Sequence, residues 1–463
     1  MNKHLLFTIV VLLFSILAKS QTNVSGNIPG NTTWTKDGSP YILTGNVGVR
    51  TGYTLIIEPG VTIERDGDYQ ILINGAVQIN GTAEDSIQFV TNKNPVPEAP
   101  QVFPFAPDNR PFVEFQKSNL DNSSLSYISF QQSNFKSNDV RVGNESQYSE
   151  TNPKNSGTLN ITHSNLSNGY ITPNGYRTQA HLAIDSCIMS NGFINNYSGT
   201  EDINISNSRI VNSIVWSNSF ANGISFTNCY LGNNQLYLMS NTTILNSTFE
   251  NNKGEAFGGG NTTIIKNSEF INTYITYPGT DFDISDSKFT VDDKLTDPYG
   301  NEIQDLIRVN HISTRNTQFV NNTSYNINGI TIYGDSGPQD NIIHNQFTNW
   351  YDAITVNHFG TIQLDSNYFS IPGRYDIVNN TTKDFSALYN QFQLKNGQNV
   401  DDVIFDQNDD LTYGLVTYTP YEIDPIVLPV TALHFSGTAT EQAVKLSWQV
   451  NKDINIANFV VER

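Results

Sequence analysis

Ile205-Ser206-Asn207-Ser208-Arg209-Ile210 is one copy of a six-residue phrase that recurs between residues 204 and 392. The phrase reads apolar, any residue, Asn, Ser, any residue, large apolar, and an Asn usually follows one or two positions later. Further copies begin at Ile244, Ile265 and Ile284. A phrase that returns every 20 to 50 residues or so is typical of solenoid folds, in which each repeat packs on its neighbours.

The last apolar residue of each copy, here called its anchor, recurs at intervals of 18 to 36 residues. The anchors are Phe130, Leu166, Ile188, Ile210, Leu231, Phe249, Phe270, Phe289, Phe319, Phe347, Phe369 and Phe392. The two apolar positions of a copy are five residues apart, so both point inward only if the chain turns between them. We therefore expect the anchors to stack as an apolar ladder inside the solenoid.

The third position of the phrase, usually Asn, is where that turn falls. Asn tolerates the left-handed backbone conformation and bonds its own backbone, so it suits a tight corner. We expect the third residues of successive coils to form a ladder along one corner. These residues are Asn207, Asn228, Asn246, Asn267, Asp286 and Asn316, and His163 and His344 occupy the same position in other coils.

Charge and the N-terminus indicate where the protein works. Acidic residues outnumber basic ones by 44 to 25, for a formal net charge of −19, so we expect no nucleic-acid partner. Residues 1–20 resemble a secretion signal, because Lys3 and His4 precede an apolar run that ends at Ala18. No later stretch is apolar enough to span a membrane. We expect a monomer that is secreted or held at the outer cell surface.

The two cysteines, Cys187 and Cys229, have a whole coil between them. Two coil steps of about 4.8 Å put their backbones beyond the roughly 7 Å that a disulfide can bridge. We therefore expect both to be free and to fill space as small buried side chains.

The β-helix is expected to span residues 21–425, in four parts. Short coils of 16 residues occupy 41–90, where Leu55, Ile71 and Ile87 recur at that interval. A proline-rich excursion covers 91–111, the main repeats cover 112–394 and a C-terminal cap covers 395–425. Residues 428–463 contain three strand-like runs, whereas a β-sandwich needs about seven strands, so we interpret this segment as part of a domain.

The Ile-x-Asn-Ser-x-Phe coils resemble the right-handed parallel β-helix repeat of secreted bacterial proteins, over roughly residues 41–420. The tail, with Leu446-Ser447-Trp448 and Phe459-Val460-Val461-Glu462-Arg463, resembles a fibronectin-type-III-like module. In relatives this module precedes a type IX secretion sorting domain, so the resemblance implies export by that route. The β-helix carries many unrelated functions, so the resemblance implies a fold and no particular chemistry.

Enzymes with this fold mostly cleave acidic polysaccharides, so their motifs are the first to seek. Polygalacturonase-type sites combine an Asp pair with Asn-Thr-Asp, Gly-His-Gly and Arg-Ile-Lys elements. Asp pairs occur at 292–293, 401–402 and 409–410, but the other elements are missing. For a lyase, the candidate patch is Arg308, His311 and Arg315, with His358 further along, although ordinary outward side chains explain these residues better.

Calcium is the one metal for which the chain offers ligands. Calcium takes about six to eight oxygen ligands, and one loop concentrates carboxylates and amides. The candidate ligands are Asp292, Asp293, Asp297, Asn301, Glu302 and Asp305. Their spacing is not that of an EF-hand, and a solvated acidic loop is the favoured interpretation.

Glycan binding has one concrete candidate site. Trp216 and Tyr237 each lie six residues past an anchor, and alternation with inward Leu236 and Leu238 turns Tyr237 outward. A stacked pair of outward aromatics suits the face of a sugar, and packing beneath a loop is an equally good explanation. The long insertions (131–158, 290–312 and 320–341) all follow an anchor, so we expect them to rise on one side as walls around short coils.

The leading hypothesis is an exported, non-catalytic β-helix protein that binds a polysaccharide or cell-surface glycan, or acts in adhesion. The alternatives are a polysaccharide lyase or glycoside hydrolase acting on acidic polysaccharide, and a passive structural spacer.

Overall fold

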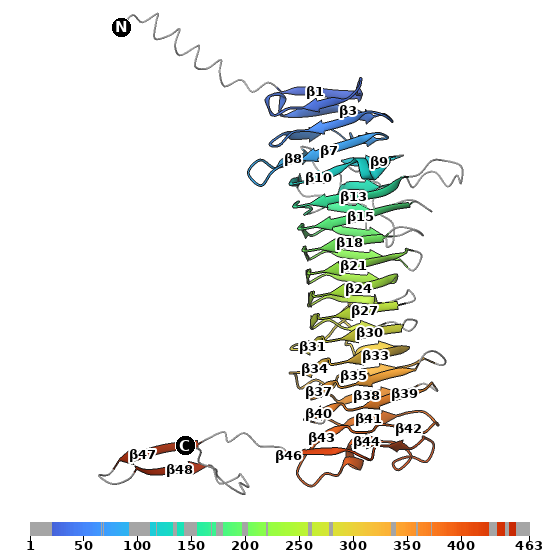
Figure 1. The fold of residues 1–463 in the computed structure, drawn as a ribbon, viewed down its shortest axis with the longest axis vertical. Helices are drawn as coiled ribbons and strands as arrows, with labels where there is room; N and C mark the ends of the chain where they lie inside the picture. Colours follow the sequence, from blue (N-terminus) through green and yellow to red (C-terminus); the bar gives the residue numbers. More distant parts are fainter. Residues whose placement is uncertain are drawn as a thin grey trace, which may run out of the picture.

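The fold comes from a computed structural model of the 463-residue chain. The structure describes residues 21–65, 67, 69–91, 112–116, 118–132, 137–142, 155–167, 169–172, 179–196, 202–218, 221–257, 262–276, 281–334, 339–357, 360–371, 373–425, 433–439 and 444–450. The expected signal at 1–20 and the proline-rich residues 92–111 lie outside these ranges. Parallel strands stack in a column from β1 (Thr22–Asn27) to β46 (Glu422–Pro425), which confirms the all-β parallel β-helix (Figure 1).

Each coil contributes one strand to each of three faces. The first face is a 16-stranded parallel sheet. Its strands are β2 (Thr32–Trp34), β4 (Thr54–Ile57), β7 (Ala76–Asn80), β10 (Ser124–Ser126), β13 (Ser156–Thr162), β15 (Gln179–Asp185), β18 (Asp202–Ser206), β21 (Gly223–Thr227), β24 (Asn241–Leu245), β27 (Thr262–Lys266), β30 (Asp281–Ser285), β33 (His311–Arg315), β36 (Asp340–Ile343), β39 (Ile362–Asp365), β42 (Phe385–Ser386) and β45 (Val416–Thr417).

The second face carries the anchors and is an 11-stranded parallel sheet. Its strands are β16 (Ile188–Ser190), β19 (Arg209–Val211), β22 (Tyr230–Gly232), β25 (Thr248–Glu250), β28 (Glu269–Ile271), β31 (Lys288–Val291), β34 (Gln318–Asn321), β37 (Gln346–Thr348), β40 (Tyr368–Ser370), β43 (Gln391–Leu394) and β46. Single bridges through Asn165 link this sheet to the earlier strand β11 (Ile128–Gln132), which extends the face toward the N-terminus.

The third face consists of two sheets in succession. The earlier sheet has 13 strands and continues into the N-terminal part of the second face. Two of its strands, β1 and β11, are introduced above. Its remaining strands are β3 (Tyr41–Val49), β5 (Thr62–Arg65), β6 (Ile71–Ile73), β8 (Ile87–Thr91), β9 (Val113–Phe115), β12 (Ser137–Val142), β14 (Gly169–Thr172), β17 (Phe193–Asn196), β20 (Ile214–Ser217), β23 (Gln235–Leu238) and β26 (Lys253–Phe257). The later sheet has six strands, and its first strand lies against β26. They are β29 (Ile275–Thr276), β32 (Asp305–Val309), β35 (Asn328–Ile332), β38 (Asp352–Val356), β41 (Tyr375–Asn379) and β44 (Ile404–Phe405).

The described helices are three short 3-10 turns: η1 (Lys36–Gly38), η2 (Leu120–Asn122) and η3 (Val400–Val403). None of them has the length or apolarity that crossing a bilayer requires.

Left-handed residues make the corner between the first and second faces, as predicted. All six residues of the predicted ladder have φ between 49° and 54°. His163 and His344, with φ of 51° and 57°, are turn residues of the same corner. Because the left-handed conformation costs an ordinary residue about 1–2 kcal/mol, the recurrence of Asn here is a backbone requirement.

A second left-handed corner, which the sequence analysis did not assign, joins the second face to the third. Its residues lie two positions after an anchor and have φ between 47° and 60°. They are Asn191, Asn212, Asn233, Asn251, Asn272, Asn349 and, as the one described residue that is not Asn, Ile371. The Asn that follows each copy of the phrase therefore marks a turn of its own, which sends the chain from the second face into a third strand.

The anchors form the apolar ladder predicted for the core. From Phe249 to Phe392, seven phenylalanines stack with successive ring centroids 4.6–5.3 Å apart and ring planes within 18° of parallel. Each is at most 1% exposed. Offset stacking of this kind adds about 0.5–1.5 kcal/mol per pair beyond simple burial, so the ladder couples each coil to the next.

One anchor was assigned to the wrong residue. Ile188 is 54% exposed, whereas Met189 is buried and pairs with the anchor Ile210. Two adjacent apolar residues left the register ambiguous, and a shift of one position moves a strand residue to the opposite face. With Met189 as anchor, Cys187 and Cys229 occupy the same position of their coils, two coils apart, and both are free and buried.

The expected 16-residue coil is also wrong. Leu55 pairs with Val77, 22 residues later, so the N-terminal coils are as long as the others. Leu55, Ile71 and Ile87 lie on three different strands, β4, β6 and β8, and belong to different faces. Side chains alternate between inward and outward on the strands of every face. The 16-residue spacing of inward side chains therefore did not reveal which face each residue occupies.

Two regions near the C-terminus complete the description. In the expected cap at 395–425, β44, β45 and β46 continue the three faces, so this segment forms one more coil. In the tail, β47 (Leu433–Ala439) and β48 (Val444–Val450) pair antiparallel. The third expected strand, near residues 459–462, lies outside the described residues.

Candidate ligand-binding surface

An open groove runs along the outside of the first corner, parallel to the stack of coils. It consists of two adjoining depressions of about 690 and 470 Å³ that share Asn246. Together they extend over the seven strands from β16 to β34. Six steps of about 4.8 Å make the groove roughly 29 Å long, which is the shape that an extended polymer requires.

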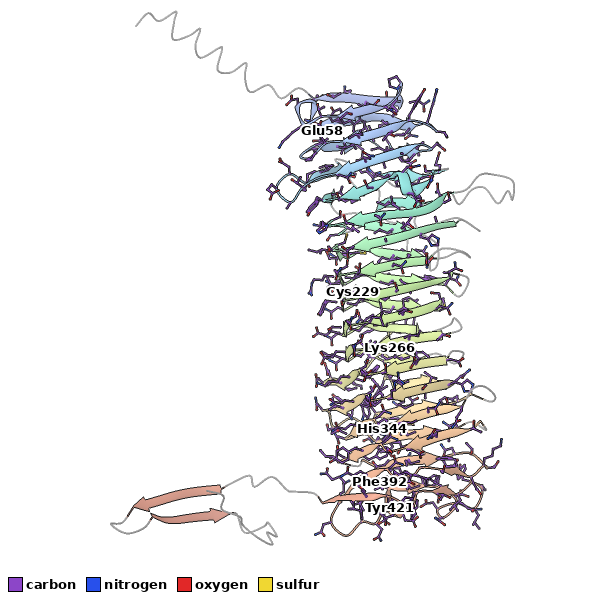
Figure 2. All side chains as sticks on the ribbon, viewed as in Figure 1. Glu58, Cys229, Lys266, His344, Phe392 and Tyr421 are labelled. Atoms are coloured by element: carbon purple, nitrogen blue, oxygen red, sulfur yellow. The ribbon has the colours of Figure 1, made fainter. Side chains whose placement is uncertain are left out.

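The phrase itself builds the groove. Its corner Asn residues form one side, and the following Ser or Cys residues, which are nearly buried, form the floor. The floor is tied from coil to coil, since the main-chain N–H of Cys187 donates to Ser208 Oγ at 3.0 Å and that of Ser247 donates to Ser268 Oγ at 3.1 Å. Cys229, in this floor, is labelled in Figure 2.

The other side of the groove comes from the fifth position of the phrase, which points outward from the second face. These residues are Ile188, Arg209, Tyr230, Thr248, Glu269, Lys288 and Gln318. Ile188 and Tyr230 give the N-terminal depression (residues 186–246) an apolar character. The C-terminal depression (residues 246–318) has polar and charged side chains.

Charged side chains that line the groove contact neighbouring side chains. The Arg209 guanidinium lies 4.1 Å from the centre of the Tyr230 ring, and the Tyr230 hydroxyl donates to Glu250 at 2.6 Å. This hydrogen bond, together with desolvation, raises the pKa of Tyr230, so the phenol stays neutral. Lys288 lies 3.7 Å from Glu269. The groove therefore offers amides, hydroxyls and one aromatic face, with little unbalanced charge.

Trp216 and Tyr237 lie on the third face, away from the groove. They pair across β20 and β23, with ring centroids 5.9 Å apart and planes tilted by 39°. Leu236 and Leu238 are buried, and the two aromatics are half-buried on the opposite side of their strands. The structure thus brings the two predicted residues together as neighbours, and a role in binding stays a prediction.

The three residues of the expected basic patch lie on two adjacent faces, and a role in catalysis stays a prediction. Arg308 is exposed on the third face and lies 4.5 Å from the Tyr333 ring centre. His311 is 8% exposed on the first face, with its Nδ1 3.7 Å from Asp340 Oδ1, and Arg315 is exposed at the far end of the same strand. The corner at residue 310 separates the first of these residues from the other two, and His358 lies outside the described residues.

In the acidic loop (residues 292–305), the carboxylates contact other groups of the protein. Asp297 accepts hydrogen bonds from Asn301 and from the main chain of Tyr299, Glu302 pairs with Lys294 at 3.0 Å, and buried Asp305 accepts from neighbouring side chains. Within the described ranges, no group of three or more His, Cys, Asp or Glu residues is arranged to hold a metal ion. Calcium binding by Asp292, Asp293 and the rest of this loop stays an untested expectation.

The sequence predicts that the three long insertions rise on one side as walls, but each range contains a regular strand of the stack, namely β12, β32 and β35. The extra residues of 290–312 leave the stack between β31 and β32, at the second corner. Residues 322–327 of the range 320–341 also leave the stack at the second corner, between β34 and β35, whereas residues 143–154 lie outside the described residues. The second corner was unassigned in the sequence analysis, so strands such as β32 and β35 were counted as insertion.

Comparison with known proteins finds no matching family model and no match among curated proteins. Among solved structures, a tailspike protein mutant of E. coli bacteriophage HK620 in complex with hexasaccharide has a TM-score of 0.27 and 10% identity, over 90% of this chain and 74% of that one. An alginate lyase from Paenibacillus sp. str. FPU-7 has a TM-score of 0.19 and 13% identity, over 81% and 93%. A mannuronic acid-specific family 6 polysaccharide lyase from human gut microbiota has a TM-score of 0.25 and 10% identity, over 74% and 87%. We draw nothing about ligand or activity from similarities of this size.

Proposed function

We propose that this chain is an exported, non-catalytic glycan-binding protein that holds a linear polysaccharide along the corner groove. The observation that supports this function best is the length and lining of the groove. A continuous trough over seven coils has a hydroxyl or a carboxamide group at every coil. A polysaccharide repeats hydroxyl groups along its length in the same way, so each coil can contribute similar hydrogen bonds.

Aromatic contacts supply the second element of glycan recognition. In the groove, Tyr230 presents a ring that Arg209 and Glu250 hold in place. On the third face, Trp216 and Tyr237 form the pair that the sequence predicts. Aromatic side chains combine an apolar face with a polar edge and lose little entropy on binding, which suits sugars.

The test is binding of purified protein to an array of polysaccharides, followed by titration of the best ligand. Tyr230→Ala should weaken binding by about tenfold, which corresponds to about 1.4 kcal/mol for the lost aromatic contact. Tyr299→Ala, at a tyrosine that is 74% exposed and outside the groove, is the matched control and should leave affinity unchanged.

Further variants show which surface binds the glycan. Arg209→Ala should weaken binding if the groove is the site, whereas Arg315→Ala, at an exposed arginine of the first face, should not. Loss of binding in a Trp216→Ala, Tyr237→Ala double variant, with the Tyr230→Ala variant unaffected, would move the site to the third face.

The rival functions predict different results in the same assays. Release of unsaturated or reducing ends from uronate-rich polysaccharide, abolished by Arg308→Ala or His311→Ala, would establish a lyase or hydrolase. Absence of binding to every glycan and to cell surfaces would leave the passive spacer as the remaining hypothesis.

A further inference from the structure

A separate pocket of about 390 Å³ opens at the second corner, near the C-terminal end of the stack. Three successive loops form it: residues 322–327 after β34, 349–351 after β37, and the segment that ends at Arg374 before β41. The volume falls in the range of about 300–1,000 Å³ that is usual for small-molecule sites. This pocket shares no lining residue with the groove, although β34 runs from Gln318 in the groove to Asn321 in the pocket.

Hydrogen bonds between the loops fix the shape of the pocket. Asn349 Nδ2 donates to the carbonyl oxygens of Asn321 at 2.7 Å and Thr323 at 3.1 Å, which ties the first loop to the second. The main-chain N–H of Arg374 donates to the carbonyl of Tyr351 at 2.7 Å, which ties the second loop to the third. The pocket is therefore formed before any ligand arrives, which lowers the entropy cost of binding.

Gly373 allows this close approach of the loops. A Cβ atom at this position would clash with the carbonyl oxygen of Trp350. Trp350 itself is 2% exposed, and its indole Nε1 donates to the carbonyl of Phe319 at 3.0 Å. The base of the pocket is thus anchored to the phenylalanine ladder.

The walls combine aromatic rings with a guanidinium group. Tyr325 is 43% exposed at the rim, and Tyr351 is half-buried beneath Arg374, whose guanidinium carbon lies 4.6 Å from the Tyr351 ring centre. Arg374 Nε donates to Asp352 Oδ1 at 2.9 Å, and its Nη2 bonds the other carboxylate oxygen. A guanidinium has five N–H donors, so three remain beyond the two that bond Asp352.

Arg374 is the charged residue among those that line the pocket, and Lys395 Nζ lies 3.5 Å from the carbonyl oxygen of Gly373 at its edge. Asp352 compensates Arg374, and Lys294, whose ammonium lies 5.8 Å from the Tyr325 ring centre, pairs with Glu302 at 3.0 Å. The rest of the lining consists of hydroxyls and carboxamides such as Ser324 and Asn326. In a chain of formal net charge −19, an anionic ligand also meets long-range repulsion.

We propose that this pocket binds one neutral sugar residue, held by Tyr325 and Tyr351 through its apolar face and by Arg374 through its hydroxyls. A uronate or sulfated sugar needs a cation without a carboxylate partner, and Arg374, the charged residue of the lining, already has Asp352 as its partner. The paired arginine suits vicinal hydroxyls, because its N–H donors are held in one plane at fixed spacing. This site is independent of the groove and stands even if the groove binds nothing.

The experiment uses the full chain and methyl glycosides of glucose, galactose, mannose and N-acetylglucosamine, with glucuronate and galacturonate as the charged counterparts. Titration followed by ligand-observed NMR should show binding of at least one neutral glycoside and weaker binding of the matching uronate. Tyr325→Ala and Arg374→Lys should each weaken that binding by about tenfold, since one removes a stacking face and the other the planar fork.

Matched variants assign any effect to the pocket. Tyr299→Ala, in the neighbouring loop, should bind the glycoside like the unmodified chain, and so should Tyr230→Ala in the groove. Circular dichroism and the thermal unfolding midpoint check that Arg374→Lys is folded, and Tyr325→Ala, at the rim, tests the pocket without changing the ion pair between Arg374 and the buried Asp352.

Three results would overturn the proposal. They are the absence of binding by every neutral glycoside, tighter binding of a uronate than of its neutral counterpart, and equal affinity in the unmodified, Tyr325→Ala and Arg374→Lys proteins. Loss of polysaccharide binding in the Tyr230→Ala variant with intact glycoside binding would separate the groove from the pocket.

Discussion

Replacing Asn367 by alanine tests whether the buried amide ladder behind the first corner stabilises the C-terminal coils. Asn367 is 1% exposed and follows a left-handed corner residue, Ser366. Its Oδ1 accepts the main-chain N–H of Asn345 at 2.9 Å, and its Nδ2 donates to the carbonyl of Ile342 at 2.8 Å and to Asn390 Oδ1 at 3.2 Å.

The cost follows from the groups that the substitution leaves without partners. Asn367→Ala removes the partner of the Asn345 N–H and one partner of the Ile342 carbonyl, both inside the stack. A buried polar group that loses its partner costs about 1–3 kcal/mol, so we expect the Asn345 N–H to cost that much and the weakened Ile342 carbonyl to add to the loss. Asn380→Ala, which removes one exposed hydrogen bond to Asn357 at 3.0 Å, should cost less than about 0.5 kcal/mol.

A residue from another coil indicates a substitution that should recover part of the lost stability. In an earlier coil the equivalent position is Ser268, whose Oγ accepts the main-chain N–H of Ser247 at 3.1 Å and donates to the carbonyl of Lys266 at 2.8 Å. Asn367→Ser should therefore recover the bond from Asn345 and lose clearly less stability than the alanine variant.

Hydrogen exchange is the suitable assay, because a solenoid can open locally at one end without unfolding as a whole. Amides of β39, β40 and β43 should exchange faster in Asn367→Ala, with an intermediate rate in Asn367→Ser. Urea unfolding gives the overall loss. Equal exchange and equal unfolding midpoints in the unmodified and Asn367→Ala proteins would refute the role given to the ladder, and so would a serine variant no better than alanine.

Two further predictions concern the backbone and the pH. Asn267→Ala should lose about 1–2 kcal/mol, because φ is 49° there, whereas Asn267→Gly should lose less in the same unfolding assay; equal losses would contradict a backbone role. Burial raises the pKa of Asp376 to about 8, while Lys395 lowers it. The folded state therefore holds a proton that the unfolded state releases, so stability should fall as pH rises from about 4 to 8, and Asp376→Asn should remove that dependence in unfolding scans across this pH range.

The fold was predictable from sequence wherever the backbone restricts residue choice. Asn207 and its equivalents were assigned to a corner because left-handed conformations favour Asn, and the phenylalanine anchors followed from the turn between two apolar positions. The same reasoning applied to Asn212 and Asn233, two residues past their anchors, would have revealed the second corner and with it the third face. The Asn that follows each copy of the phrase carried this information, but it was interpreted as part of the first corner.

The candidate sites were less predictable, since they depend on contacts between coils. Arg374 and Asp352 are 22 residues apart and meet only because β38 and β41 pair, and Tyr325 reaches the same pocket from a third coil. The spacing of Arg308, His311 and Arg315 suggested proximity, yet one tight corner sends their side chains to different faces. Loop lengths between faces, which sequence alone does not assign, decide which side chains converge.

The groove and the fold use different positions of the same phrase. Its first, third, fourth and sixth positions are constrained, by the core, the corner and the floor. The fifth position points outward into the groove and varies freely, as Arg209, Tyr230, Glu269 and Lys288 show. Exchanging fifth-position residues between coils should therefore change affinity for a glycan while leaving the unfolding midpoint nearly unchanged, since surface substitutions of this kind rarely alter stability by more than about 0.5 kcal/mol. Specificity in such a solenoid is set by the residues that the fold leaves unconstrained.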